Sequence, residues 1–300
     1  MGKNMLFVYN PRAGKAQIRS NLLDIIDIFV KADYEVTAYP TQKPGDAIKA
    51  VKNRREGYDI VVCSGGDGTL DEVVRGMMRC EEKLPIGYVP AGSTNDFANS
   101  LKIPRSMIKA ADVVVNGKLF KCDVGAFNDD SFIYVAAFGI FTDVAYETKQ
   151  DLKNVLGHTA YLLEGMKRLS SIKSYHMKIT CDDMELDEEY IYGMITNSNS
   201  VAGFKGITGK DVELNDGMFE VTLIRKPAIL KDMNDIMAAL TDKRIESDAI
   251  KVFKASKIII ESEQEVAWTL DGEYGGSHNK VVVENKKEAL EIKVPFEILK

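Results

Sequence analysis

Glycines, a threonine and carboxylates gather in the segment SGGDGTLDEV, where a predicted strand meets a predicted helix. The apolar run YDIVVC ends at this point, and Gly65 and Gly66 are followed by Asp67, Gly68 and Thr69. Such a turn leaves backbone N–H groups free at a helix N-terminus, and these groups bind anions such as phosphate. Asp67 would repel a bare phosphate. Phosphate binding at this turn therefore needs a metal ion or a nearby base that offsets the charge.

Three further loops carry residues that could bind or react: NPRAGK at 10–15, PAGSTNDFA at 90–98 and LDGEYGG at 270–276. Each loop, taken alone, also has an ordinary structural interpretation. Glycine pairs form tight turns, and hydroxyl, amide and carboxylate side chains cap helices. Asp-Gly pairs, at 216–217 and at 271–272, are typical of hairpin turns. Only their combination can indicate a function.

Several common sites are excluded by the motifs. The P-loop pattern fails, because Ala16 follows the lysine of AGKA and Tyr9 stands where its first glycine should be. A GxGxxG fingerprint that opens a helix is absent, and so are the HRD and DFG elements of protein kinases. The three histidines, at positions 158, 176 and 278, have no metal-binding spacing, so a zinc hydrolase or a histidine-based triad is not expected.

Composition limits the partners and the cellular location. The 300 residues carry a formal charge of −6, which argues against a broad nucleic-acid-binding surface. Four widely spaced cysteines without a CxxC pair are typical of reduced thiols in a cytoplasmic protein. The apolar run near the N-terminus is too short for a signal peptide, and no run is long enough to span a bilayer. We expect any lipid contact to be made at the membrane surface.

The first 125 residues alternate strand and helix patterns. Apolar residues 18–30 recur at helical spacing between strand-like runs at 5–10 and 34–40, and the alternation continues through strands at 58–65 and 84–90. Alternating strands and helices predict a parallel sheet covered by helices, with ligands at the carboxyl ends of its strands. The turns after Tyr9, Cys63 and Val89 lie at such ends.

From about residue 126 the pattern changes to shorter strands with polar turns, which is typical of a β-sandwich. Two helices, near 158–170 and 228–241, interrupt it. We therefore predict an α/β nucleotide-binding domain at 1–126 and a β-sandwich domain at 127–300. Whether the final strand packs back on the first domain is left open. The predicted strands of the second half are 131–140, 175–183, 189–198, 218–226, 255–263, 264–273, 279–286 and 289–296.

The chain resembles the soluble bacterial diacylglycerol kinase family, which is similar to the catalytic domains of eukaryotic diacylglycerol, sphingosine and ceramide kinases. The segments NPRAGK, GGDGTLDEVV, PAGSTNDFA, DVGAF, LNDGMFEV and LDGE occur in the order of that family. GGDGT alone is shared with NAD kinases and more loosely with phosphofructokinases. Its combination with the other segments is more specific, and the resemblance covers about residues 5 to 297.

The resemblance implies a nucleotide site in the cleft between the two domains, with ATP as co-substrate. Backbone N–H groups and hydroxyls at this site would suit phosphate oxygens without a P-loop lysine. Magnesium would resolve the conflict between Asp67 and phosphate. By similarity, the nucleotide-binding residues are Asn10, Pro11, Arg12, Ala13, Gly14, Thr41, Gly66, Asp67, Gly68, Thr69, Leu70, Asp71, Glu72 and Thr94.

The resemblance also implies a Mg²⁺ site and a general base. Asp216 would bind the ion with the backbone carbonyls of Glu213 and Met218, and oxygen ligands suit magnesium. Asp123 would reach the magnesium that the nucleotide carries. Glu273 matches the base that accepts the proton of the lipid hydroxyl, and Asp271 is the competing candidate. The sequence does not rank these two.

The implied reaction is phosphorylation of diacylglycerol to phosphatidic acid, by a cytoplasmic enzyme at the inner face of the membrane. Candidate membrane or phosphate contacts are Arg12, Lys15, Lys167 and Arg168, although the last two also suit a solvated helix face. A homodimer is expected only by resemblance. Three alternatives stay open. The acceptor could be another lipid alcohol (a monoacylglycerol, phosphatidylglycerol, undecaprenol or a sphingoid base), the protein could bind nucleotide or lipid without turnover, or, less favoured, it could be an NAD kinase.

Overall fold

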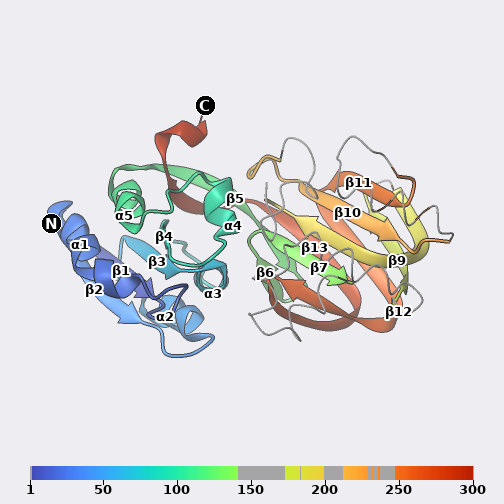
Figure 1. Ribbon diagram of the computed structural model, residues 1–300, viewed down its shortest axis with the longest axis horizontal. Helices are drawn as coiled ribbons and strands as arrows, with labels where there is room; N and C mark the ends of the chain where they lie inside the picture. Colours follow the sequence, from blue (N-terminus) through green and yellow to red (C-terminus); the bar gives the residue numbers. More distant parts are fainter. Residues whose placement is uncertain are drawn as a thin grey trace.

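The structure is a computed structural model that describes residues 2–140, 173–182, 184–198, 212–228 and 247–299, together with Asp232 and Ile236. Figure 1 shows two halves side by side, with the helices in the first and mainly strands in the second. The helix predicted near 158–170 lies outside the described residues, as does almost all of the one predicted near 228–241.

The first half alternates strands and helices along the chain. β1 pairs in parallel with β2 and β3, and β3 pairs in parallel with β4. All residues of β3 and β4 are buried, as expected for central strands of a sheet covered on both faces. The carboxyl ends of these strands therefore meet at one edge. The elements are β1 (Lys3–Tyr9), α1 (Ile18–Lys31), β2 (Tyr34–Pro40), α2 (Asp46–Arg54), β3 (Ile60–Gly65), α3 (Asp67–Met78), β4 (Ile86–Pro90), α4 (Asp96–Ser100) and α5 (Met107–Asn116).

The second half is antiparallel. Its strands alternate buried and exposed residues where one face meets solvent, as β8 does along its whole length. The elements are β5 (Lys118–Phe127), β6 (Asp130–Phe132), β7 (Val135–Gly139), β8 (Tyr175–Cys181), β9 (Met184–Thr196), β10 (Phe219–Arg225), β11 (Ile250–Ala255), β12 (Lys257–Leu270), β13 (Glu273–Val294) and a final 3-10 helix (Phe296–Leu299).

Two of these strands are longer than the sequence pattern indicated. β12 joins the strands predicted at 255–263 and 264–273, and β13 joins those at 279–286 and 289–296. The pairing register shifts within each strand, between Glu261 and Val266 in β12 and between Lys286 and Leu290 in β13. Such bulges break the alternation of side chains, so the sequence resembles two strands with a turn between them. β5 was not predicted, and most residues of its first half are exposed.

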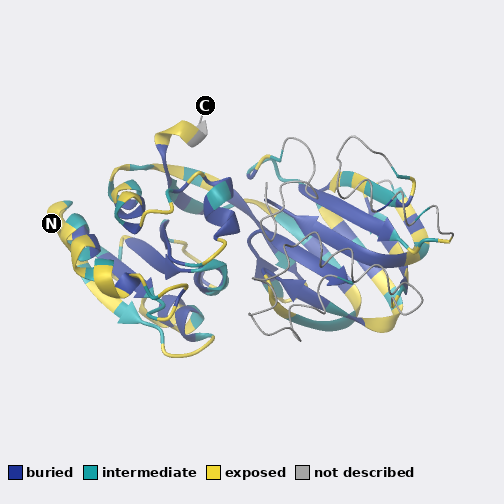
Figure 2. Ribbon diagram, viewed as in Figure 1, coloured by how far each residue is buried: buried dark blue, intermediate teal, exposed yellow. Residues whose placement is uncertain are grey.

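β13 connects the two halves. It pairs antiparallel with β12 and β5, and Ile292 also pairs in parallel with Ile86 of β4. The end of the last strand thus lies beside the parallel sheet. Figure 2 shows buried residues concentrated in the strands of both halves. One core cluster includes Phe7 and Phe29, and a second surrounds Trp268. A domain boundary at 126/127 stays a prediction.

Candidate active site

The turns after β1, β2 and β3 lie against one another at the carboxyl edge of the parallel sheet. The Asn10 N–H donates to Ser64 O at 2.8 Å, and the Thr41 N–H donates to Tyr9 O at 2.9 Å. These contacts follow from the parallel pairing, which brings equivalent strand ends together. Segments that lie 30 to 60 residues apart in sequence therefore form one surface.

Glycine makes the closest approaches on this surface possible. The Ala91 N–H donates to Gly65 O at 2.7 Å, and a Cβ built on Gly92 would lie 2.6 Å from the Cα of Gly66. Gly14 has a φ of +52°, and a Cβ on it would collide with the carbonyl oxygen of Ala91. Because a side chain at these positions would push the backbones apart, the glycines bring three loops into contact.

Amide and hydroxyl side chains fix the loops in place. Asn95 adopts a left-handed conformation, φ 53°, and its side chain bonds Gly92 twice, accepting from N–H and donating to C=O, both at 2.9 Å. The Tyr88 hydroxyl lies 3.4 Å from Asn95 Oδ1. Asn10 Nδ2 donates to Thr69 Oγ1 at 3.5 Å. The sequence gives no signal for this role of Tyr88, because the residue stands in the apolar run of a buried strand.

The residues expected to bind nucleotide are not equally accessible. Arg12, Gly14 and Thr94 are exposed at this edge, and Pro11 is partly exposed. By contrast, the side chain of Leu70 is buried in the first core cluster, as is Ala13. A contact of those two residues with nucleotide would have to use the backbone. The nucleotide-binding set as a whole stays a prediction.

Two of the acidic residues of α3 point to two different neighbours. Asp67 lies at the N-terminus of α4, where its carboxylate accepts from Phe97 N–H at 3.4 Å. Burial raises the pKa of Asp67, and backbone N–H groups of that turn oppose the shift. Glu72 accepts from the N–H groups of Gly45 and Ala47, at 2.7 and 3.0 Å, at the start of α2. The Glu72 side chain therefore stabilises the N-terminus of α2. The sequence did not predict this role of Glu72.

Asp71, the third acid of α3, faces the second half of the chain. Its carboxyl lies beside that of Asp271, where a hydrogen bond forms only if one of the two groups carries a proton, and it lies 3.5 Å from Arg75 Nη1. Burial and the neighbouring Asp271 charge raise its pKa well above the ordinary value. The Asp71 side chain thus belongs to an interface between the halves.

Asp271 is buried and fully engaged by backbone. Its carboxylate accepts from the N–H groups of Ile133, Tyr134 and Val135, at 2.6, 3.0 and 2.9 Å. It also begins the turn between β12 and β13, with φ 50° followed by φ 87° at Gly272. Two successive left-handed residues form a type I′ hairpin, for which Asp-Gly is a favoured pair.

Glu273 follows this turn and lies close to the glycine-rich loop of the first half. The residue is exposed, and its Oε1 lies 3.6 Å from the position of a Cβ built on Gly68. The hairpin thus places one acid in the interior and the next acid of the same motif beside GGDGT. This approach brings together two predicted site segments that lie far apart in the sequence.

The LNDG loop carries a carboxylate that already binds a cation. Asp216 Oδ1 accepts from Met218 N–H at 2.8 Å, and its Oδ2 lies 2.9 Å from Lys254 Nζ. The same ammonium lies 3.2 Å from buried Glu220. A carboxylate that attracts a cation, with the backbone carbonyls of Glu213 and Met218 in the same loop, offers the hard oxygen ligands that magnesium prefers. The Asp216 loop therefore fits Mg²⁺ in its chemistry, although Lys254 competes for one oxygen.

Asp123 is less suited to a metal. It is buried, and its two carboxylate oxygens each accept a backbone N–H at 2.7 Å, from Gly217 and from Glu288. These bonds hold the LNDG loop to β5 and β13. Within the described part of the chain, no group of three or more His, Cys, Asp or Glu residues is arranged to hold a metal. A role of Asp123 at a nucleotide-bound magnesium stays a prediction.

The candidate contacts for anionic headgroups can be placed only in part. Lys15 and Arg12 are exposed in the turn after β1, whereas Lys167 and Arg168 lie outside the described residues. No described helix is both long and apolar enough to cross a membrane.

Comparison with known proteins assigns the family. Residues 4–127 match the diacylglycerol kinase catalytic domain, and residues 135–294 match the YegS C-terminal NAD kinase beta sandwich-like domain. A diacylglycerol kinase of Bacillus subtilis (strain 168) is 35% identical over 277 residues, which cover 91% of each chain. The chain belongs to the diacylglycerol kinase family. A diacylglycerol kinase of Staphylococcus carnosus is 34% identical over 300 residues, which cover 99% of this chain and 97% of that protein.

The kinase family assignment agrees with the fold. A crystal structure of a diacylglycerol kinase from Bacillus anthracis superposes with a TM-score of 0.83 at 22% identity, covering 99% of this chain and 98% of that one. The predicted combination of a catalytic α/β domain with a β-sandwich-like domain is confirmed at that level. The sequence segments on which the resemblance was based are therefore the candidate catalytic and binding segments.

Proposed function

We propose that the protein is a lipid kinase that transfers the γ-phosphoryl group of ATP to the free hydroxyl of diacylglycerol, giving phosphatidic acid and ADP. The lipid oxygen forms the new bond to phosphorus, the bond from phosphorus to the β,γ-bridging oxygen breaks, and the hydroxyl proton passes to a base. In phosphoryl transfer, the protein mainly positions the reactants and stabilises charge.

The observation that carries the proposal is the approach of Glu273 to the GGDGT loop. Glu273 is exposed, and it lies beside Gly68 at the N-terminus of α3. A carboxylate so placed can accept a proton from a hydroxyl aligned with a phosphate on that loop. Asp271, by comparison, accepts three backbone N–H bonds and is buried. Between the two candidates, this geometry favours Glu273 as the base.

The nucleotide is proposed to lie across the loops at the ends of β1, β3 and β4, in a cleft between the halves. The support is that glycines bring these loops into contact and that Gly14 and Thr94 are exposed there. Backbone N–H groups in such turns bind phosphate oxygens. Residues 10–14, Thr41, 66–72 and Thr94 are the proposed nucleotide contacts, with Glu72 and Asp71 acting through the positions of α2 and α3.

Magnesium is proposed at the LNDG loop, held by Asp216 and the carbonyls of Glu213 and Met218. When bound, the ion supplies positive charge that ties the loop together next to the site. The chain itself prepares the loop, because Asp123 holds Gly217 and Glu288 by their N–H groups. Asp123 at a magnesium on the nucleotide remains part of the proposal.

Because diacylglycerol resides in membranes, the enzyme is proposed to work at the inner membrane surface with transient contact. Exposed Arg12 and Lys15 could attract anionic headgroups, each contributing about 1 kcal/mol close to the surface. A homodimer is proposed on family resemblance, with an edge strand of the sandwich such as β11 at the interface.

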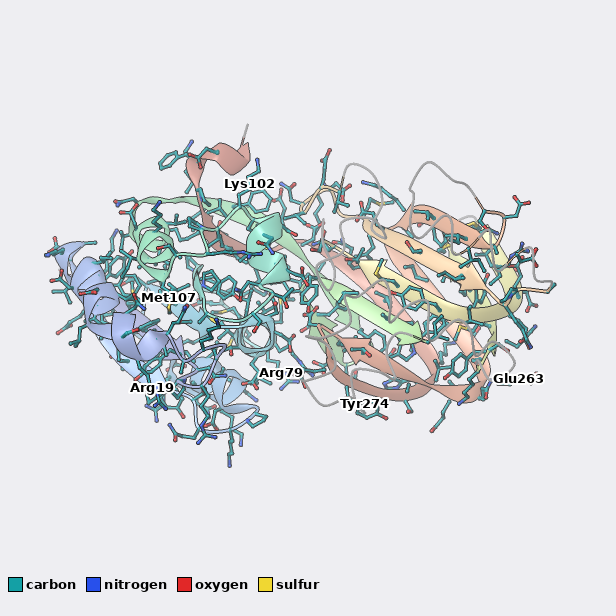
Figure 3. All side chains as sticks on the ribbon, in the orientation of Figure 1. Arg19, Arg79, Lys102, Met107, Glu263 and Tyr274 are labelled. Atoms are coloured by element: carbon teal, nitrogen blue, oxygen red, sulfur yellow. The ribbon has the colours of Figure 1, made fainter. Side chains whose placement is uncertain are left out.

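The test is transfer from labelled ATP with Mg²⁺ to diacylglycerol in mixed anionic micelles. The wild type should form phosphatidic acid, and Glu273→Gln should lower kcat by about 10²–10⁴-fold with ATP binding retained. Glu263→Gln is the matched control, since Glu263 is exposed on β12 at the far end of the second half (Figure 3). Unchanged turnover in Glu273→Gln would remove it as the base.

The acceptor is tested separately. If the wild type phosphorylates another lipid alcohol but not diacylglycerol, the kinase assignment stands and the substrate changes. If it phosphorylates none, while ATP still binds, the protein is a non-catalytic member of the family.

A further inference from the structure

α3 presents a row of charged residues toward the second half of the chain. Asp71, Arg75 and Arg79 follow one another at intervals of four, which places them along one side of the helix and its C-terminal end. Figure 3 shows Arg79 on the side of the first half that faces the second. Charged groups that are shielded from solvent at such an interface need partners, because burying an unpaired charge is costly.

Arg75 and Arg79 both form ion pairs with Asp130 of β6. Arg75 donates from Nε to Asp130 Oδ1 at 2.9 Å, and its Nη2 contacts the other carboxylate oxygen. Arg79 Nη2 lies 3.5 Å from Asp130 Oδ1. The Arg75 side chain is only 18% exposed. A two-pronged arginine–carboxylate pair with little solvent is strong and fixes direction as well as distance.

Asp71, one turn earlier, is buried against the hairpin of the second half. It is 1% exposed, and its Oδ1 has no hydrogen-bond donor among the described residues if the group is ionised. The nearby oxygens belong to Asp271. Burial raises the pKa of Asp271 to about 6, but the three N–H groups that its carboxylate accepts oppose this shift and favour the anion. If Asp71 carries a proton instead, it donates to Asp271 and both groups are satisfied.

We infer that Asp71 is a positioning residue, a carboxylic acid that donates a hydrogen bond to Asp271 while Arg75 fastens the same helix to Asp130, so that α3 holds the turn carrying Glu273 in place. The inference rests on the proposed function for the role of Glu273. α3 starts at the GGDGT loop, and the turn leads directly into Glu273. The pair thus sets the distance between the proposed base and the proposed phosphate site.

The surroundings of Asp71 favour its protonated form, although Arg75 opposes it. Burial is the largest cause of its raised pKa, and the charge of Asp271 adds to the shift. Arg75 acts in the opposite direction, and it shares its charge with Asp130. Tyr134, which is buried beside these acids, has its pKa raised by burial and by the charges of Asp271, Asp67, Asp96 and Asp71. Acids outnumber the bases here, so a proton on Asp71 relieves repulsion.

A buried protonated acid makes stability depend on pH in a defined direction. The folded protein keeps this proton to a higher pH than the unfolded chain, in which an aspartate ionises near pH 4. The stability that the proton contributes is therefore complete below about pH 4 and declines as the pH rises through the pKa of the folded state. Asp71→Asn replaces the carboxylic acid with a neutral hydrogen-bond donor that cannot ionise. The stability of this variant should therefore not show the decline.

The experiment compares wild type, Asp71→Asn and Asp71→Ala, with Asp112→Asn as the control because Asp112 is exposed on α5. Melting is followed from pH 5 to pH 9, and kcat and KM are measured over the range in which all are folded. We expect the melting temperature of Asp71→Asn, relative to that of the wild type, to be about 2–4 °C higher at pH 9 than at pH 5. The kcat of Asp71→Ala should lie about tenfold below that of Asp71→Asn, with a smaller difference in KM between the two variants.

Two results would overturn the inference. One is an Asp71→Asn profile parallel to the wild type together with a kcat loss equal to that of Asp71→Ala, since this means that the charge and not the proton matters. The other comes from Arg75→Gln and Asp130→Asn, which serve even if both Asp71 variants fail to fold. Purely additive losses of kcat and stability in that double-mutant cycle would show that the two side chains do not act as a pair. Asp129→Asn, at the exposed neighbour of Asp130, is the control.

Failure of the proposed function would look different. The melting comparison needs no lipid, so it tests the Asp71–Asp271 pair even in a protein that phosphorylates nothing. A wild type without lipid kinase activity, but with the expected melting difference, rejects the function and retains the pair. An active wild type with parallel melting profiles and an inactive Asp71→Asn rejects the pair and retains the function.

Discussion

The glycine loops of the first half and the Asp271–Gly272 hairpin of the second half lie next to each other but are built differently. The loops can approach each other only because glycine has no side chain. A Cβ on Gly92 would lie 2.6 Å from the Gly66 Cα. The hairpin relies on a side chain, because Asp271 binds three backbone N–H groups. In the first region the backbone is left available for a ligand. In the second, one acid is used as a brace, and Glu273 is left exposed.

The hairpin should be the more sensitive region in stability. Asp271→Ala leaves three buried N–H groups without an acceptor, at about 1–3 kcal/mol each, so we expect a loss of at least about 3 kcal/mol. Glu273→Ala removes an exposed side chain and should change the free energy of unfolding by less than about 0.5 kcal/mol. Urea unfolding measures both. Equal losses would contradict the division of roles between the two acids.

The glycine loops should respond next most strongly. Gly92→Ala places a methyl 2.6 Å from the Gly66 Cα and 2.7 Å from Asn95 Oδ1, so the two loops must separate. We expect a loss of about 1–3 kcal/mol, as for other overpacked sites, and a weaker affinity for ATP. Gly57→Ala is the control. Alanine is strained at Gly57 by its left-handed φ of +83°, which Gly92 does not share, but a Cβ there would have no neighbour within 4 Å. Its loss of stability should leave ATP affinity unchanged, and equal ATP affinities in the two variants would argue against a nucleotide at these loops.

The sequence predicted the parts of this site better than their arrangement. The parallel strands followed from alternating apolar runs and helical spacing, and the family assignment followed from the order of the motifs. The acids of GGDGTLDE were expected to act together at the nucleotide. In the structure, Asp71 and Glu72 contact Asp271 and the start of α2, since consecutive helix residues point about 100° apart.

Other features depend on residues far apart in sequence. Asp271 and Glu273 have equal claims in the motif LDGE, and only the three N–H groups of residues 133–135 separate them. Arg75 and Asp130 stand 55 positions apart, and no local pattern joins them. The spacing of four between Asp71 and Arg75 was the one available signal, and it is common on solvated helices.

A smaller loss of stability is expected at the LNDG loop when Lys254, the cation beside Asp216, is replaced. Lys254→Met removes an ammonium that lies 2.9 Å from Asp216 and 3.2 Å from buried Glu220. Because Lys254 is partly exposed, solvent weakens the pairs, and we expect a loss of about 1–2 kcal/mol. Mg²⁺ should then raise the melting temperature more than in the wild type, since it can take the freed oxygen of Asp216. Lys254→Met with Glu220→Gln should recover part of the stability, and identical Mg²⁺ responses of Lys254→Met and wild type would argue against a metal at this loop.

The smallest effect on stability is expected at Gly68, where the two regions meet. Its Cβ would lie 3.6 Å from Glu273 Oε1, which is an ordinary van der Waals distance, so the fold has room for it. Because alanine favours a helix over glycine by up to about 1 kcal/mol, Gly68→Ala should be as stable as the wild type or slightly more so. The added methyl nevertheless occupies the space between the proposed phosphate site and the proposed base. We expect kcat for lipid phosphorylation to fall with stability unchanged, measured by transfer and melting on the same preparation. Normal kcat in a stable Gly68→Ala would mean that the reacting groups do not pass between Gly68 and Glu273.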